Sequence, residues 1–203
     1  MKVLNLYAGL GGNRKLWKGV NVTAVENVPE IAKFYADHFP EDEIIIDDAH
    51  AYLLKHYAEF DFIWSSPPCQ SHSRARFWGS KDNPVYPNLK LYEEIILLNH
   101  FCNSHWVVEN VIPYYKLLIN PSVLIGRHLF WSNFEISPIL IEKVSEFDRG
   151  NIRSLEKLFG FSIDGYNMNM NNIGKRQILR NIVHPKIGLH IFNCFLDSKR
   201  SLF

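Results

Sequence analysis

The sequence has few cysteines, little net charge and no long hydrophobic run. Its 203 residues include only three cysteines, and this odd, widely spaced set argues against a disulfide framework. No apolar stretch approaches the roughly 20 residues needed to cross a bilayer, and the apolar stretch before the first glycines is too short for a signal peptide. A net charge of +1 argues against binding to nucleic acid through bulk charge. We therefore expect a cytosolic protein with one sizeable core.

The charges are unevenly distributed along the chain. Residues 1–142 hold 12 Lys and Arg against 16 Asp and Glu, a net of −4, whereas residues 143–203 hold 10 against 5, a net of +5. This asymmetry favours a C-terminal third that faces a polyanion.

Short β-branched runs alternate with helical patterns over the first two thirds of the chain, which is typical of βαβ units and a parallel sheet. Residues 135–175 do not continue this alternation of strand and helix patterns, which indicates a small irregular subdomain or exposed loop. The predicted fold class is α/β, a mostly parallel sheet with helices on both faces. The expected strands are 2–7, 22–27, 43–47, 60–65 and 105–111, with a strand pair in 127–136, and the expected helices are 14–19, 29–39, 49–58, 88–101 and 185–197.

Glycines and acids follow three successive expected strands. The segment LYAGLGG follows the first strand, but its spacing does not match the G-x-G-x-x-G of nicotinamide-dinucleotide sites. Glu26, at the end of the second strand, could accept hydrogen bonds from a ribose diol, and Asp48, after the third, could hold an adenine amino group. Together they predict a pocket for an adenosine-bearing cofactor at the carboxyl edge of an open sheet.

The segment SSPPCQSHS, residues 65–73, directly follows an apolar strand. Pro67 and Pro68 fix the backbone and so hold Cys69 in one place, where a nearby cation or helix N-terminus would favour the reactive thiolate. On the next strand, WVVENV buries Glu109, and burial favours the protonated carboxyl group. The two residues form a candidate pair of nucleophile and general acid. The alternative is a strand-ending turn in which the thiol merely packs.

Four motifs, in this order along the chain, resemble those of DNA cytosine-5 methyltransferases: L-x-A-G-L-G-G at 6–12, P-P-C-Q-S at 67–71, E-N-V at 109–111 and R-N-I-V-x-P at 180–185. The likeness covers residues 1 to about 134 and about 174 to 193. It implies a Rossmann-like fold that uses S-adenosylmethionine to methylate position 5 of cytosine in double-stranded DNA, through a covalent cysteine adduct on a flipped base. Cys69 would be the nucleophile. Glu109, with Asn110 beside it, would hold the target base, and Arg127 would approach the reacting cysteine and the base.

The resemblance also assigns a cofactor pocket, and no metal is expected. The pocket would be lined by Tyr7, Ala8, Gly9, Leu10, Gly11, Gly12, Glu26, Asn27, Asp48, Ala49 and Pro68, and completed by Asn181 and Val183.

The polar segment 71–87 is a candidate lid over the flipped base. Basic and polar side chains could contact the nucleic acid, and solvated surface is the alternative for them. These candidates are Gln70, Ser71, Ser73, Arg74, Arg76, Lys81, Arg149, Arg153, Lys157, Lys175 and Arg176.

The expected organisation is a catalytic and cofactor-binding domain at 1–134, a reduced target-recognition region at 135–173, and a C-terminal segment at 174–203 that returns to the catalytic domain. The recognition region is short for the family. We favour a short self-contained reader, and the alternative is completion by a second subunit or by self-association. Two other functions stay open: the same chemistry on RNA, or a non-catalytic nucleic-acid-binding subunit. A bacterial or phage-infected cell, with a restriction-modification role, is the expected setting.

Overall fold

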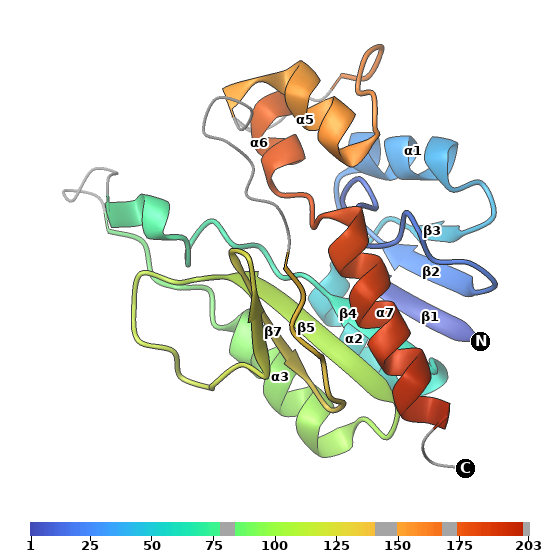
Figure 1. The fold of residues 1–203 in the computed structure, drawn as a ribbon, viewed down its shortest axis with the longest axis vertical. Coiled ribbons are helices and arrows are strands. Elements are labelled where there is room, and N and C mark those ends of the chain that lie inside the picture. Colours follow the sequence, from blue (N-terminus) through green and yellow to red (C-terminus); the bar gives the residue numbers. More distant parts are fainter. Residues whose placement is uncertain (78–83, 141–149, 168–173, 201–203) are drawn as a thin grey trace.

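One seven-stranded sheet organises the chain (Figure 1). The computed structural model describes residues 1–77, 84–140, 150–167 and 174–200. The strand order is β3-β2-β1-β4-β5-β7-β6. The first five strands run parallel, β7 is antiparallel to β5, and β6 is antiparallel to β7. The strands are β1 Lys2–Leu6, β2 Asn21–Val25, β3 Glu43–Ile45, β4 Phe62–Ser65, β5 His105–Val111, β6 Val123–Ile125 and β7 His128–Ser132.

Helices connect the strands and cover the sheet. They are α1 Pro29–His38, α2 Ala49–His56, α3 Lys90–Phe101, α5 Ile152–Phe159, α6 Lys175–Arg180 and α7 Pro185–Arg200, with short 3-10 helices η1 Tyr57–Glu59 and η2 Arg74–Phe77. A proline starts α1, where its missing N–H costs nothing, and the side chain of Asp48 caps α2. None of the helices in the described ranges has the length and apolar composition of a membrane span.

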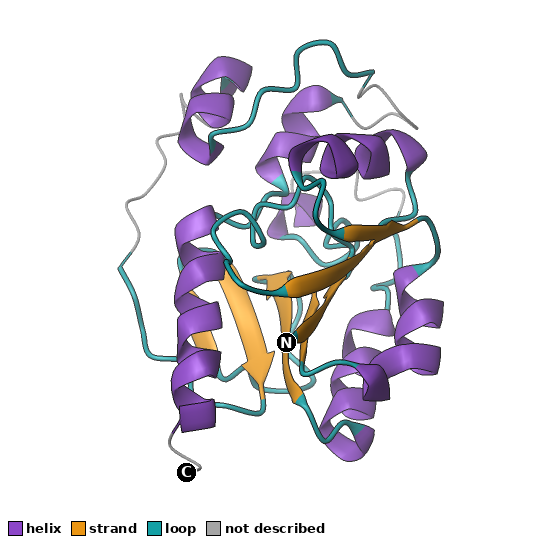
Figure 2. Cartoon of the chain, turned by 90° about the vertical axis from the view of Figure 1, so that its right-hand side faces the viewer, coloured by secondary structure: helices purple, strands orange, loops and turns teal. Residues whose placement is uncertain are grey.

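Two apolar cores lie on opposite faces of the sheet, because successive side chains of a strand point to opposite faces. Val3 and Phe62 belong to the core that contains α1 and α7, and Leu4 and Ile63 belong to the core that contains α2 and α3. Figure 2 shows α7 on one side of the sheet and α2 and α3 on the other. The predicted α/β class, with helices on both faces, is confirmed.

Two predictions of secondary structure were wrong. Residues 14–19 form turns rather than a helix. Only six residues lie between Gly19 and Gly12, the last residue of the glycine turn at 9–12, and six are too few to offset the cost of starting a helix. The strand pair joins 123–125 to 128–132 instead of lying within 127–136. Its turn places Gly126 at φ +61°, which suits a tight hairpin.

Part of 135–175 is regular rather than irregular. It contains α5, which is capped by Asn151 and packs Leu155 and Phe159 into the same core as α1.

Candidate active site

The site lies where the order of the sheet reverses. Strands β1 and β4 are neighbours, and their connections leave toward opposite sides, which in open α/β sheets creates a crevice at the carboxyl ends of the strands. The glycine turn follows β1, the Pro-Pro-Cys turn follows β4, and Glu109 and Asn110 lie near the end of the adjacent β5.

The glycine turn is shaped by protein packing as much as by open space. A Cβ added to Gly12 would lie 2.2 Å from Ile182 Cγ2 and 2.5 Å from the carbonyl of Val183, so this glycine lets the C-terminal segment approach the turn. A Cβ added to Gly9 (φ +54°) would have no neighbour closer than 3.9 Å. Gly9 therefore borders open space, whereas Gly11 packs against Phe39 and Gly12 against the C-terminal segment. The cofactor roles of all three glycines stay predictions.

Glu26 ties the end of β2 to the glycine turn. Its carboxyl oxygens accept from the backbone N–H of Gly9 and of Val28, each at 3.0 Å, and the residue is 7% exposed. Burial raises the pKa of Glu26, and these backbone donors oppose the rise. A carboxyl group held in this way is fixed in place at the predicted cofactor pocket, and its neighbour Asn27 is exposed.

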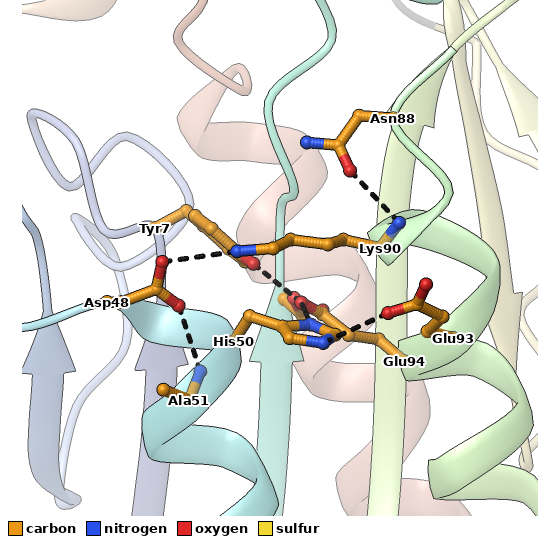
Figure 3. Close-up of polar contacts among 9 residues, drawn as sticks. Tyr7, Asp48, His50, Ala51, Asn88, Lys90, Glu93 and Glu94 are labelled. Atoms are coloured by element: carbon orange, nitrogen blue, oxygen red, sulfur yellow. Dashed lines mark hydrogen bonds and ion pairs between the residues drawn. The ribbon is translucent and has the colours of Figure 1, made fainter. Parts of the chain in front are cut away.

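A buried polar cluster supports the same edge of the sheet (Figure 3). Glu94 of α3 is fully buried and accepts from the hydroxyl of Tyr7 at 2.6 Å and the hydroxyl of Ser65 at 2.5 Å, and its Oε1 lies 3.0 Å from His50 Nδ1. Burial and the Glu94 charge raise the pKa of Tyr7, which keeps its hydroxyl a donor. The cluster therefore joins the ends of β1 and β4 to α2.

Asp48 is held at the rim of this cluster. One carboxyl oxygen accepts from the N–H of Ala51 at 2.9 Å and the other from Lys90 Nζ at 3.2 Å (Figure 3). These contacts lower the pKa of Asp48, the Ala51 N–H most. Its side chain remains half exposed, so a ligand can still reach it.

The other predicted cofactor residues differ in exposure. Ala8, Leu10, Ala49 and Val183 are buried, whereas Pro68 and Asn181 are exposed.

The Pro-Pro-Cys turn is fixed to β5. The side-chain amide of Asn110 donates to the carbonyl of Pro67 at 3.0 Å, and the carbonyl of Cys69 accepts from the N–H groups of His72 and Ser73, both at 3.0 Å. Cys69 itself is half-buried. The turn therefore holds the thiol at the end of β4, beside the end of β5.

The surroundings of Cys69 disfavour its thiolate. Burial and, next, the negative charge of Glu109 raise its pKa to about 11, and the positive charge of Arg127 acts in the opposite direction. The expected cation is present, but it does not outweigh burial. The effect of the Glu109 charge on the Cys69 thiol indicates that the structure brings these two predicted residues near each other.

Glu109 has a partner that the sequence reasoning missed. Its Oε1 lies 2.5 Å from Nδ1 of His128, and both residues are 6% exposed. On the other side of the imidazole, Arg127 Nε donates to Nε2 at 3.1 Å, and Nη2 of Arg127 donates to the carbonyl of Arg180. Thus His128 contacts the Glu109 carboxyl group, and Arg127 contacts the far side of the His128 ring. The role of Arg127 toward the cysteine and the base stays a prediction.

The predicted nucleic-acid contacts lie in two places. Gln70, Arg74 and Arg76 are exposed in the segment after Cys69, with Arg76 Nε bonded to the carbonyl of Gln70 at 3.1 Å. The hydroxyls of Ser71 and Ser73 accept backbone N–H groups of the same region.

The second group comes from α5 and α6, which Figure 1 shows apart from η2. Arg153 and Arg176 are exposed and Lys175 is half-buried. Arg149 and Lys81 lie outside the described residues.

Comparison with known proteins decides the family. A family model described as C-5 cytosine-specific DNA methylase matches residues 1–111. The chain belongs to this family. Cytosine-5 methyltransferases use S-adenosylmethionine, so membership identifies the cofactor and implies a nucleic-acid substrate. No curated protein matches the chain.

Three solved structures are similar to parts or to nearly all of the chain. The methyltransferase EhMeth of Entamoeba histolytica is 12% identical, with a TM-score of 0.51 over 98% of each chain. A DNMT2 variant of Spodoptera frugiperda is 26% identical with a TM-score of 0.39, and the match covers 54% of this chain but 35% of that one. A SAM-dependent methyltransferase of Agrobacterium tumefaciens is 15% identical with a TM-score of 0.41, covering 57% and 40%. The chain described here therefore spans less than half of the last two proteins, and its likeness to EhMeth shows the methyltransferase fold.

Proposed function

We propose that this cytosine-5 methyltransferase acts on cytosine in DNA, with Cys69 as the nucleophile and Glu109 as the residue that holds the target base. The observation that carries the proposal is the bond from Asn110 to the Pro67 carbonyl, because it fixes the thiol-bearing turn to the strand that carries Glu109. The charge of Glu109 reaches Cys69. A base that enters between them could meet the thiol and the carboxyl group at once.

The chemistry requires this pair. Carbon 5 of cytosine is a poor nucleophile, so the Cys69 thiolate first forms a bond to carbon 6, while a hydrogen bond or proton from Glu109 at ring nitrogen 3 takes up the displaced charge. Carbon 5 of the resulting enamine would then take the methyl group, and the sulfonium sulfur would keep the electron pair of its broken bond and leave as the thioether of S-adenosylhomocysteine. Transfer of the carbon 5 proton to a base or to water would let the carbon–hydrogen electrons re-form the ring double bond and expel the Cys69 thiolate.

Residues of the glycine turn fit S-adenosylmethionine, which supplies an electrophilic methyl group on a positively charged sulfur. Gly9 borders open space, and Glu26 and Asp48 lie at the ends of β2 and β3, where they can accept hydrogen bonds from a nucleoside. Val183 and Asn181 would close the pocket, since the Val183 carbonyl lies against the position of a Gly12 side chain.

The nucleic-acid substrate must present a base outside its helical stack, because carbon 6 cannot be reached within a duplex. Flipping costs about a few kcal/mol. Arg74 and Arg76, exposed just after the Cys69 turn, are suited to contact phosphates of the flipped nucleotide. Arg153 and Arg176 on the second surface would contact the flanking duplex, in agreement with the positive charge of the C-terminal third.

The test is transfer of radiolabelled methyl groups from S-adenosylmethionine to a mixed-sequence DNA duplex and, in parallel, to RNA of the same sequence. We expect labelled DNA with the wild type, none with Cys69→Ser, and wild-type labelling with Cys102→Ser, since Cys102 lies at the end of α3.

Other outcomes would change the proposal. Labelled RNA without labelled DNA would keep the chemistry and change the substrate. Equal labelling by the wild type and Cys69→Ser would exclude covalent catalysis by this thiol. An absence of labelling on both substrates would favour a non-catalytic subunit.

A further inference from the structure

The pairing of β5 with β7 brings His128 to Glu109. In the antiparallel register, Glu109 lies opposite Phe130 and Val111 lies opposite His128, so Glu109 and His128 are diagonal neighbours on one face. Diagonal neighbours are within reach of long side chains. These two side chains are in contact: Nδ1 of His128 and Oε1 of Glu109 are 2.5 Å apart, and both side chains are almost entirely buried.

Arg127 determines which ring nitrogen carries the hydrogen. A neutral imidazole has one N–H, and Nε2 accepts from Arg127 Nε at 3.1 Å. The hydrogen must therefore lie on Nδ1, where it is donated to Oε1 of Glu109.

This arrangement occupies only one oxygen of the carboxyl group. Within the described part of the chain, Oε2 of Glu109 has no hydrogen-bond partner, and it is not among the fully buried polar atoms that lack one. The Glu109 side chain keeps 8% of its surface exposed. Oε2 is thus the atom available to a ligand.

We propose that His128 is a positioning residue for the methyl-transfer reaction: it holds Oε1 of Glu109 so that Oε2 faces nitrogen 3 of the flipped cytosine. This inference rests on the proposed role of Glu109. Arg127 fixes the imidazole and is itself anchored on the carbonyl of Arg180, next to the segment proposed to close the cofactor pocket. The position of the base-holding carboxyl group is therefore linked to the C-terminal segment.

Three substitutions separate positioning from burial. His128→Leu removes the donor and keeps an apolar side chain of moderate size. His128→Asn keeps a donor, because an asparagine amide nitrogen lies near the place of Nδ1. His105→Asn is the matched control, since His105 is a half-buried histidine at the opposite end of β5.

The measurement is release of tritium from carbon 5 of cytosine in DNA, which reports addition of the thiol to carbon 6. Binding of S-adenosylhomocysteine and the thermal midpoint are recorded for the same preparations. We expect His128→Leu to slow tritium release at least about 100-fold, the lower range for loss of acid catalysis. We expect His128→Asn to stay within about tenfold of the wild type, His105→Asn to match the wild type, and cofactor affinity to stay unchanged throughout.

A double substitution tests whether the two side chains act together. If His128 acts through Glu109, then His128→Leu should cause no further loss of rate in a Glu109→Gln background. Independent, multiplying losses would overturn the proposal, as would tritium release by His128→Leu within threefold of the wild type. Equal slowing by the leucine and asparagine variants would also overturn it, because a donor would then be irrelevant. A wild-type protein inactive on both DNA and RNA would instead remove the proposed function, and the inference with it.

Discussion

Cys69 should titrate far above neutral pH when the protein is alone. Burial and the Glu109 carboxylate raise its pKa from 9.0 to about 11. At pH 8 a thiol with a pKa of 9.0 is about 9% thiolate, whereas one with a pKa of 11 is about 0.1% thiolate. The thiolate is the nucleophile, so alkylation at pH 8 should be about 100-fold slower than that of an ordinary cysteine, apart from any effect of access.

The assay is the pH profile of iodoacetamide labelling, measured by mass spectrometry. The background protein carries Cys102→Ser and Cys194→Ser, so that Cys69 is the only thiol that iodoacetamide can label. The midpoint of the profile gives the pKa and does not depend on how accessible the sulfur is. Because Glu109 raises the pKa of Cys69 and Arg127 lowers it, Glu109→Gln should move the midpoint down and Arg127→Gln should move it up.

Two results would refute this reasoning. A wild-type midpoint near 9.0 would mean that burial does not act on the thiol as described. A Glu109→Gln midpoint above that of the wild type would mean that the carboxylate does not lie near the sulfur. Glu43→Gln is the control, because Glu43 is exposed on β3 at the edge of the sheet and should leave the midpoint unchanged. A midpoint near 11 would mean that bound ligands must favour the thiolate before it can react.

Three further predictions follow from packing and charge. Gly12→Ala should lower the free energy of unfolding by about 2 kcal/mol, because the added Cβ would lie 2.2 Å from a side-chain carbon of the C-terminal segment. Gly150→Ala, where that Cβ meets nothing within 4 Å, should not do so in the same urea titration. Asn110→Ala should lower kcat for methyl transfer at least tenfold with little change in cofactor affinity, since it removes the hydrogen bond to the Pro67 carbonyl that holds the Cys69 turn. A kcat equal to that of the wild type would contradict this. The pKa of His50 is raised from 6.5, chiefly by Glu94, so its stabilisation is fully present below pH 6.5 and is lost as pH rises through the higher folded-state value. His50→Gln should therefore destabilise the protein at pH 5.5 but not at pH 9 in denaturant titrations, and a pH-independent difference would refute the linkage.

The parallel part of the fold was predictable because its signals are local. The β-branched runs at 2–7 and 60–65 carry the strands β1 and β4, and the proline before 30–39 marks the start of α1. The expected helix at 14–19 is too short to form by itself, and its residues make other contacts. Arg14 donates to the carbonyl of Trp17 and forms a buried ion pair with Asp42. The ion pair depends on the position of the segment that follows α1, which no local pattern contains.

The buried acid Glu94 shows what helical spacing could still have revealed. Leu91, Ile95 and Leu98 form the buried stripe of α3, and position 94 falls within this stripe, three residues after 91 and four before 98. Its neighbour Glu93 is exposed, although its Oε2 also lies 3.2 Å from Nε2 of His50. The spacing therefore distinguishes the buried acid from the exposed one. The partners of Glu94, which are Tyr7 after β1 and Ser65 on β4, could be identified only from the fold.

The position of His128 required knowledge of a pairing register. The motif at 109–111 pointed to Glu109 from the sequence alone, but its partner is set by where β7 pairs with β5. A shift of β7 by one residue would turn His128 to the other face of the sheet and leave the Glu109 carboxyl group buried without a donor. That register is pinned by the Gly126 turn and by Phe130, which is fully buried opposite Glu109. The geometry of the base-holding carboxyl group therefore depends on a hairpin turn, and a substitution that shifts this hairpin should slow addition to cytosine before it weakens cofactor binding.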